Sequence, residues 1–140
     1  MPSAALSDLT HTVIRCAIRV HDLFGPGLVE SAYLLPFIWE LEDHDLLCRK
    51  QVSVSLEYRG RRINNAYVMD ILVEELVVVE VKAVEQLLPV HLAQTISYVR
   101  LANMPAGLLI NFHEKYLVDG VRRVLNDRPT RPNPIKSIVG

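Results

Sequence analysis

One apolar stretch, residues 68–82, constrains the fold more than any other part of this chain. Its second half, Leu76 to Val81, is apolar at every position except Glu80 and is β-branched at four of its six positions. Such a run is typical of a strand that is buried on both faces of a sheet. Burying a carboxylate without a partner costs roughly several kcal/mol, so we expect Glu80 to serve a purpose other than packing.

Two further charged residues accompany Glu80. Lys82 lies two positions later, and side chains at i and i+2 of a strand share a face. Asp70 lies ten positions earlier, and Glu74-Glu75 between the two apolar runs predicts a hairpin turn. A two-residue turn would pair position 70 with 79 and send Asp70 to the face away from Glu80. A loop of odd length, or a bulge, pairs 70 with 80 and brings the two carboxylates together.

This pattern has two interpretations. In the first, Asp70, Glu80 and the Val81 carbonyl supply hard oxygen ligands to a divalent metal ion such as Mg²⁺. Lys82 then holds or deprotonates a water molecule aimed at a phosphorus atom. In the second, Lys82 forms a structural ion pair with Glu80 or Asp70 at the end of the sheet. Spacing alone favours the ion pair.

The order of several motifs resembles the PD-(D/E)XK nuclease-like superfamily. An Asp is followed by Glu-x-Lys on the next strand, and a Q-x-x-x-Y motif, Gln94 to Tyr98, follows in a helix. The segment from Gly27 to Tyr33 fits the G-x-x-E-x-x-Y signature of one small bacterial and archaeal family in that superfamily. The resemblance covers about residues 10 to 125. It implies an α/β fold with an αβββαβ restriction-endonuclease-like core, in which helices flank a small mixed β-sheet.

The resemblance also implies a site. Its Mg²⁺ or Mn²⁺ ligands would be Glu30, Asp70, Glu80 and the backbone carbonyl of Val81. Its catalytic residues would be Asp70, Glu80, Lys82, Gln94 and Tyr98. Gln94 would orient the attacking water or a phosphate oxygen, and Tyr98 would hold Gln94 or Lys82 in place.

The residues of this implied site also have simpler explanations. Glu30 is a carboxylate in the first turn of a helix, where the helix dipole favours negative charge. Gln94 and Tyr98 are a polar pair four residues apart on a helix surface. His91, one turn earlier, would line the same cleft. His21 lies at a helix C-terminus, which favours a structural role over a catalytic one.

Hydrophobic periodicity predicts the order helix, helix, strand, strand, strand, helix, strand. Ser3, or Ser7 with Asp8, can cap the first helix, and Gly25-Pro26-Gly27 ends it. Pro89 opens the third helix, which has the length of a right-handed crossover to a parallel strand. The expected helices span residues 6–24, 28–43 and 89–102, and the expected strands span 47–58, 62–73, 76–82 and 107–112. Two alternatives remain open after that: an edge strand at 116–118, and a helical turn at 121–125.

Length and charge limit the remaining possibilities. A chain of 140 residues with half of them apolar predicts one nuclease-like domain, residues 1–127, followed by a Pro-rich basic tail, residues 128–140. We expect the tail to be extended and poorly ordered without a partner, and a solvated terminus is favoured over nucleic-acid contact. The formal charge of -1 excludes a protein that coats nucleic acid. Arg59, Arg61 and Arg62 are nevertheless candidates for nucleic-acid binding.

Two cysteines, Cys16 and Cys48, lack the spacing of a metal or redox motif. We interpret them as free thiols in a reducing cytoplasm. No apolar run approaches the roughly 20 residues of a membrane span, and the N-terminus lacks the pattern of an export signal.

The leading functional hypothesis is a Mg²⁺- or Mn²⁺-dependent nuclease that hydrolyses phosphodiester bonds of nucleic acid, with DNA favoured. The alternative is a binding or scaffold module that keeps the nuclease-like fold without cutting. A regulatory partner in a complex is a third reading, which the sequence does not separate from the second. A homodimer would help so small a nuclease to span a duplex.

Overall fold

The computed structural model describes residues 3–127 and 135–139 and contains three helices, a short 3-10 helix and six strands over that part of the chain. In chain order the elements are α1 (Ala4–Phe24), α2 (Glu30–Asp43), β1 (Cys48–Tyr58), β2 (Arg61–Val73), β3 (Val77–Lys82), α3 (Pro89–Leu101), β4 (Ala106–Asn111), η1 (Leu117–Gly120), β5 (Val121–Leu125) and β6 (Ile135–Val139). None of the described helices combines the length and apolar character of a membrane span.

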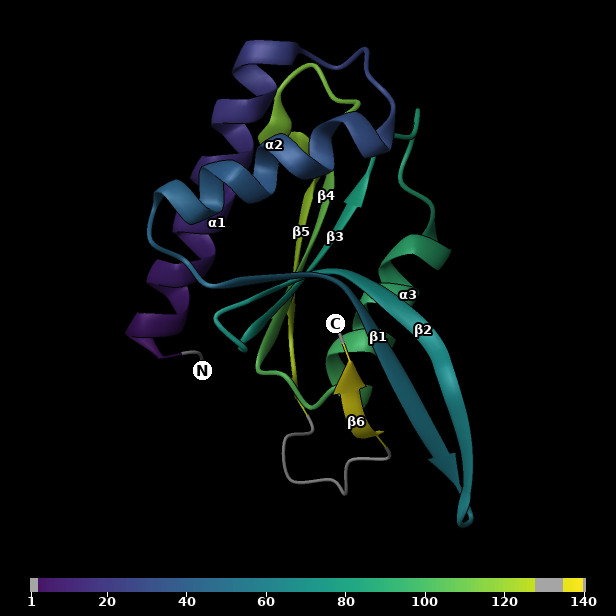
Figure 1. Ribbon diagram of the computed structural model, residues 1–140. Coiled ribbons are helices and arrows are strands. Elements are labelled where there is room, and N and C mark those ends of the chain that lie inside the picture. The colour runs from purple at the N-terminus through teal and green to yellow at the C-terminus, as the bar shows by residue number, and fades with distance from the viewer. Residues whose placement is uncertain (1–2, 128–134, 140) are drawn as a thin grey trace.

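The strands form one mixed sheet in the order β5-β4-β3-β2-β1-β6. Strands β3 and β4 are parallel, and every other neighbouring pair is antiparallel. Helix α3 connects the two parallel strands, as expected for a crossover. Helices α1 and α2 cover one face of the sheet and α3 covers the other (Figure 1). The predicted α/β fold, with its αβββαβ order and flanking helices, is therefore confirmed.

The apolar run of β3 is buried because it faces two cores. Val77, Val79 and Val81 pack against α1 and α2, whereas Val78 packs on the opposite face with Val99 of α3. All four of these β3 valines are fully buried. The hydrophobic pattern that predicted a strand covered on both sides is thus explained by one helical layer on each side.

The ends of the helices follow local chemistry. The Leu6 N–H donates to the Ser3 hydroxyl at 3.1 Å, so Ser3 is the N-cap of α1. Gly25, with φ of +70°, ends that helix in a conformation that only glycine adopts easily. The predicted opening of α3 at Pro89 is confirmed.

Residues 116–125 form neither the edge strand at 116–118 nor the helical turn at 121–125 that the sequence left open. Residues 116–118 form no edge strand, because η1 begins at Leu117. Residues 121–125 form strand β5 and no helical turn, because the open edge of β4 accepts them as an antiparallel partner. Of the predicted tail, residues 128–134 and 140 lie outside the described part. Residues 135–139 form β6 and pair with the central part of β1, a partner too distant in sequence for local patterns to identify.

Candidate active site

Asp70 and Glu80 lie opposite each other where β2 and β3 separate. The ladder pairs Val73 with Val77 and ends at Ile71 with Val79, so one further step sets Asp70 against Glu80. The connecting loop, residues 74–76, has three residues, and Glu74 and Glu75 both adopt positive φ. The odd loop length therefore gives the register that brings the two carboxylates together.

Beyond the last backbone pair of β2 and β3, the Asp70 and Glu80 carboxylates accept hydrogen bonds from backbone N–H groups. The Val81 N–H donates to Asp70 Oδ2 at 2.8 Å, and the Asp70 N–H donates to Glu80 Oε2 at 3.0 Å. Glu80 is only 6% exposed, whereas Asp70 is half-buried. The two side chains thus cover the end of the β2–β3 ladder, and Asp70 is the more accessible one.

The chain changes face at Asp70. Met69 packs in the core beneath α3, but Ile71 packs in the core beneath α1 and α2. By register Asp70 lies opposite Gln51 of β1, and Gln51 has φ of +51°. Both strands therefore twist at this pair, and the Asp70 side chain is directed toward Val81 between β2 and β3 and joins neither core.

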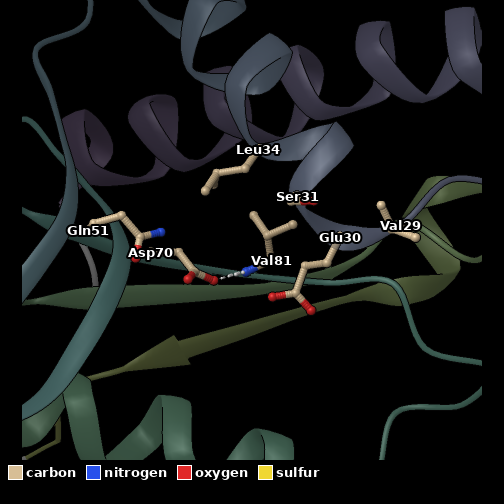
Figure 2. A pocket seen from close by; sticks show the side chains of 7 residues that line it. All are labelled: Val29, Glu30, Ser31, Leu34, Gln51, Asp70 and Val81. Carbon is tan, nitrogen blue, oxygen red and sulfur yellow. Dashed lines mark hydrogen bonds between the residues drawn. The ribbon is translucent and has the colours of Figure 1, made fainter.

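A cavity of about 440 Å³ opens beside Asp70. Figure 2 shows the carboxylates of Asp70 and Glu30 on either side of Val81, with Glu30 contributed by the first turn of α2. The lining residues are Val29, Glu30, Ser31, Leu34, Gln51, Asp70 and Val81. The structure thus brings Glu30, Asp70 and Val81 to one cavity. Glu80 is not among the lining residues, and it is bonded to the backbone of Asp70.

The position of Glu30 depends on Tyr33, one turn later in α2. The buried Tyr33 hydroxyl donates to the Gly25 carbonyl and accepts from the Leu28 N–H at 3.0 Å. Its ring stacks on Phe112 with centroids 4.6 Å apart. Tyr33 therefore fixes the loop between α1 and α2, and this loop sets where α2, and with it Glu30, begins.

The pKa values of the Glu30, Asp70 and Glu80 carboxyl groups are all raised, so their surroundings do not fully stabilise three negative charges. Burial, followed by the neighbouring Asp70 carboxylate, raises the pKa of Glu80 to about 8. Burial also raises the pKa of Asp70, opposed by the Val81 N–H and by Lys82. The pKa of Glu30 is raised by burial and by Asp70, and lowered by Lys82 and His91. The site is therefore an acidic cluster that a nearby cation would stabilise.

Lys82 lies in the field of all three carboxylates but is not locked to them. Over residues 3–127, no ion pair within 4.0 Å joins its ammonium group to Asp70 or Glu80. The interpretation of these residues as a structural ion pair therefore has no support in the described part of the chain.

Gln94 and Tyr98 lie on α3 and differ in their surroundings. Gln94 is exposed, and no hydrogen bond connects it to the carboxylates in the described part of the chain. Tyr98 stacks on Tyr67 of β2, with centroids 4.3 Å apart and planes at 4°. Burial, followed by the Glu80 and Asp70 carboxylates, raises the pKa of Tyr98. Tyr98 is thus held near the cluster, whereas Gln94 lies on the solvent side.

Sequence reasoning missed two residues near the cluster. The Tyr67 hydroxyl is buried without a hydrogen-bond partner in the described residues, and burial, Tyr98 and Glu80 raise its pKa.

Gln51 is the second of these residues, and it lines the cavity. At the hairpin turn Tyr58 pairs with Arg61, and this register continued along both strands would place Arg49 opposite Asp70. The register shifts between Val54 and Leu56, so Gln51 lies opposite Asp70 instead. Local sequence carries no clear signal of such a shift.

Two histidines anchor backbone. The Leu88 N–H donates to His91 Nδ1 at 2.9 Å, so His91 helps to begin α3. His21 is buried, and its Nε2 donates to the Glu114 carbonyl at 2.6 Å. The predicted structural role of His21 is therefore confirmed.

The three arginines proposed for nucleic-acid contact lie elsewhere. Arg59, Arg61 and Arg62 are exposed at the tip of the β1–β2 hairpin, which extends away from the three helices (Figure 1). The guanidinium of Arg59 lies 5.3 Å from the centre of the Tyr58 ring. The structure therefore does not bring these arginines to the carboxylate cluster.

Comparison with known protein families gives one finding. The family model described as the PD-(D/E)XK nuclease superfamily matches residues 7–124. The matched span contains the cavity, both strands that carry the carboxylates, and α3. Comparisons with curated proteins and with solved structures give no match.

Proposed function

Because this chain belongs to the PD-(D/E)XK nuclease superfamily, we propose that it hydrolyses phosphodiester bonds of nucleic acid, with DNA as the favoured substrate. The observation that carries the proposal is the facing pair Asp70 and Glu80, which lies beside a cavity and within the field of Lys82. Gly27, Glu30 and Tyr33 support placement in the G-x-x-E-x-x-Y family of that superfamily.

The residues of the site fit a divalent cation. Nucleases of this superfamily generally use divalent metals. Carboxylate oxygens of Glu30, Asp70 and Glu80, with the Val81 carbonyl, are the hard donors that Mg²⁺ and Mn²⁺ prefer. Their raised pKa values reflect desolvation and mutual repulsion, which a dication offsets. When bound, the ion would supply Lewis-acid stabilisation of phosphate charge and acidify water.

The other residues of the proposed site would act directly on phosphate or water. Lys82, free of an ion pair in residues 3–127, would stabilise negative charge on the phosphate or take a proton from the attacking water. Gln94, exposed on α3, would orient the water or a phosphate oxygen once substrate covers it. Tyr98, held by its stack on Tyr67, would hold Gln94 or Lys82 in place.

Substrate contact beyond the cleavage site is proposed for the hairpin tip. Arg59, Arg61 and Arg62 project from it and would contact the phosphate backbone. A homodimer would present two such tips and two cavities to a duplex. Two free thiols are consistent with a reducing cytoplasm, which we propose as the compartment.

A cleavage assay tests the proposal. Purified protein is incubated with DNA or RNA in Mn²⁺, in Mg²⁺ or in EDTA, beside Lys82→Ala and the control Lys115→Ala, which changes an exposed lysine outside the site. We expect metal-dependent cleavage by the wild type and the control, and a rate lower by about 100-fold or more for Lys82→Ala. Equal cleavage by all three would indicate a contaminating nuclease and would reject the proposal.

One observation favours the scaffold alternative. The Asp70 and Glu80 oxygens already accept backbone hydrogen bonds, and within the described residues Glu30, Asp70 and Glu80 do not form a set of ligand atoms within 4.8 Å of one another. Metal binding therefore requires some side-chain movement. Calorimetric titration with Mn²⁺ separates the two functions, because absence of binding at millimolar concentration would favour the scaffold.

A further inference from the structure

A second group of potential ligands lies between α1 and α2, outside the cavity described above. Cys16 of α1 is fully buried and faces Glu40 near the end of α2 and His44, the residue that follows that helix. One ligand atom from each of these three side chains lies within 4.8 Å of the other two. In the described part of the chain no other set of three His, Cys, Asp or Glu residues is this close.

We propose that Cys16, Glu40 and His44 bind a transition-metal ion, for which Zn²⁺ is the best match. Thiolate, imidazole and carboxylate are the three ligand types that Zn²⁺ takes in proteins, whereas Mg²⁺ prefers oxygen alone. A thiolate and a carboxylate together carry two negative charges, which the ion would neutralise in a largely buried position. The site is independent of the proposed nuclease activity.

The local structure holds the ligands in place. Glu40 in the last turn of α2 and His44, which follows that helix, are neighbours, because His44 Nδ1 lies 3.4 Å from the Glu40 carboxylate. The Cys16 thiol donates to the Glu40 carbonyl at 3.8 Å, which connects the two helices at this point. Bound metal would therefore link α1 to α2 directly.

His44 lies close to both the backbone and the carboxylate of Glu40. Its Nδ1 lies 2.9 Å from the Glu40 carbonyl oxygen and 3.4 Å from the Glu40 carboxylate. Because a carbonyl oxygen only accepts, Nδ1 carries the proton in the neutral ring. Metal would bind through Nε2, or through Nδ1 once its bond to the Glu40 carbonyl is broken. A backbone carbonyl bonded to the other ring nitrogen is a common partner of metal-binding histidines.

The cluster is open to solvent on one side. The side chains of His44 and Glu40 are 32% and 26% exposed, so an ion can reach the buried thiol past them. A role for Cys16 as a nucleophile is less consistent with its surroundings. Burial and the Glu40 carboxylate raise the pKa of its thiol to about 11, which leaves it protonated and unreactive at neutral pH.

Cys48 is the candidate for a fourth ligand. This second free thiol is half-buried at the start of β1 and packs against the hydrophobic core that contains Cys16. Its thiol donates to the Leu46 carbonyl at 3.7 Å. Cys48 therefore lies against the same core as Cys16 but is not part of the set of three.

Cobalt substitution tests the proposal with a readout other than activity. The full-length wild type is titrated with Co²⁺, and the thiolate-to-cobalt charge-transfer band in the near ultraviolet is recorded. This band reports sulfur ligation, so carboxylate ligation at Asp70 does not contribute to it. Circular dichroism checks the fold of each variant: His44→Ala, Cys16→Ser, Cys48→Ser, Asp70→Asn and the control His11→Ala, which changes an exposed histidine of α1.

We expect the band in the wild type, in Asp70→Asn and in the control. Cys16→Ser should abolish it, and His44→Ala should weaken cobalt binding about 10-fold or more. Loss of the band in Cys48→Ser would support the site with four ligands, and retention would support it with three. Absence of the band in the wild type, or a band that His44→Ala and Cys16→Ser leave unchanged, would overturn the proposal.

Thermal denaturation provides a second measurement. Metal that binds only the folded chain should raise the Tm of the wild type and of Asp70→Asn by about 5 °C at saturating Zn²⁺. The same addition should leave the Tm of folded His44→Ala nearly unchanged. An equal rise in His44→Ala would contradict ligation at this cluster.

Discussion

The two halves of the β1–β2 hairpin have the same secondary structure but different surroundings. In the base half, Val52, Val54, Met69 and Leu72 are fully buried between the sheet and α3. In the tip half, residues 61–66 are exposed throughout, and the side chains of Tyr58 and Ile63 are 62% and 52% exposed. Packing therefore fixes the base half, which carries Asp70, whereas the tip half extends beyond the helices (Figure 1).

A register shift separates the halves. Strand β2 has three residues, 64–66, where β1 has Ser55 alone between paired positions. Asn65 adopts positive φ there and bonds through its side chain to Ser53. The comparison shows that packing fixes the position of Asp70 in the base half, whereas the tip half faces solvent and is available for the proposed contact with nucleic acid.

Asp70→Asn gives the largest expected effect on this comparison. The amide oxygen can still accept from the Val81 N–H, so the fold should persist while the negative charge is lost. We expect metal-dependent cleavage to fall by about 100- to 1,000-fold, measured as kcat/KM on DNA. Activity within about threefold of the wild type would place the catalytic centre elsewhere.

Truncation of apolar side chains should separate the halves by stability. Met69→Ala opens a cavity in the core beneath α3 and should cost about 2–5 kcal/mol of unfolding free energy. Ile63→Ala, at the exposed tip, should change it by no more than about 0.5 kcal/mol. Urea denaturation measures both, and similar costs would show that the tip is packed in solution.

Replacement of Arg59, Arg61 and Arg62 by Gln should act on binding. We expect DNA affinity at low salt to fall about 10-fold or more, with cleavage at saturating DNA retained. Each lost phosphate contact should lower the salt dependence of binding by about 0.9 in the logarithmic slope. Loss of kcat with unchanged affinity would assign these arginines to catalysis instead.

The pH dependence of stability should depend on Glu80, the β3 residue that is bonded to Asp70 of the base half. Because folding raises the pKa of Glu80 from 4.5 to about 8, the folded state binds more protons than the unfolded state between these values. Stability of the metal-free protein should therefore fall as pH rises through this window. Glu80→Gln in EDTA should flatten this decline, as should Mn²⁺ added to the wild type. If the Tm of Glu80→Gln fell as steeply with rising pH as that of the wild type, Glu80 would not be the group responsible for the pH dependence.

Tyr67→Phe should have the smallest effect on stability. The buried hydroxyl has no hydrogen-bond partner in the described residues, so its removal should leave the unfolding free energy unchanged or raise it by up to about 1 kcal/mol. Tyr98→Phe is the matched control on the facing ring. A drop in cleavage for Tyr67→Phe at unchanged stability would assign its hydroxyl to the reaction.

Much of the fold follows from local patterns. The order of helices and strands up to β4 was predictable, because the alternation of apolar side chains reflects which faces are covered. Glu80 and Lys82 stood out because charge is costly in a buried strand. The sequence predicted that Asp70 would face Glu80 only if the loop between β2 and β3 had an odd number of residues. The observed loop has three residues, so the condition is met.

The sequence by itself determined the class of fold and the acidic, lysine-bearing strand pair, since both are written in neighbouring residues. Tertiary structure alone decided what lies around them. It placed Gln51 opposite Asp70 through a register shift and paired residues 135–139 with β1. It also brought Cys16 of α1 to Glu40 and His44 at the end of α2. These contacts join segments far apart in the chain, and their geometry depends on how layers pack, which no local spacing encodes.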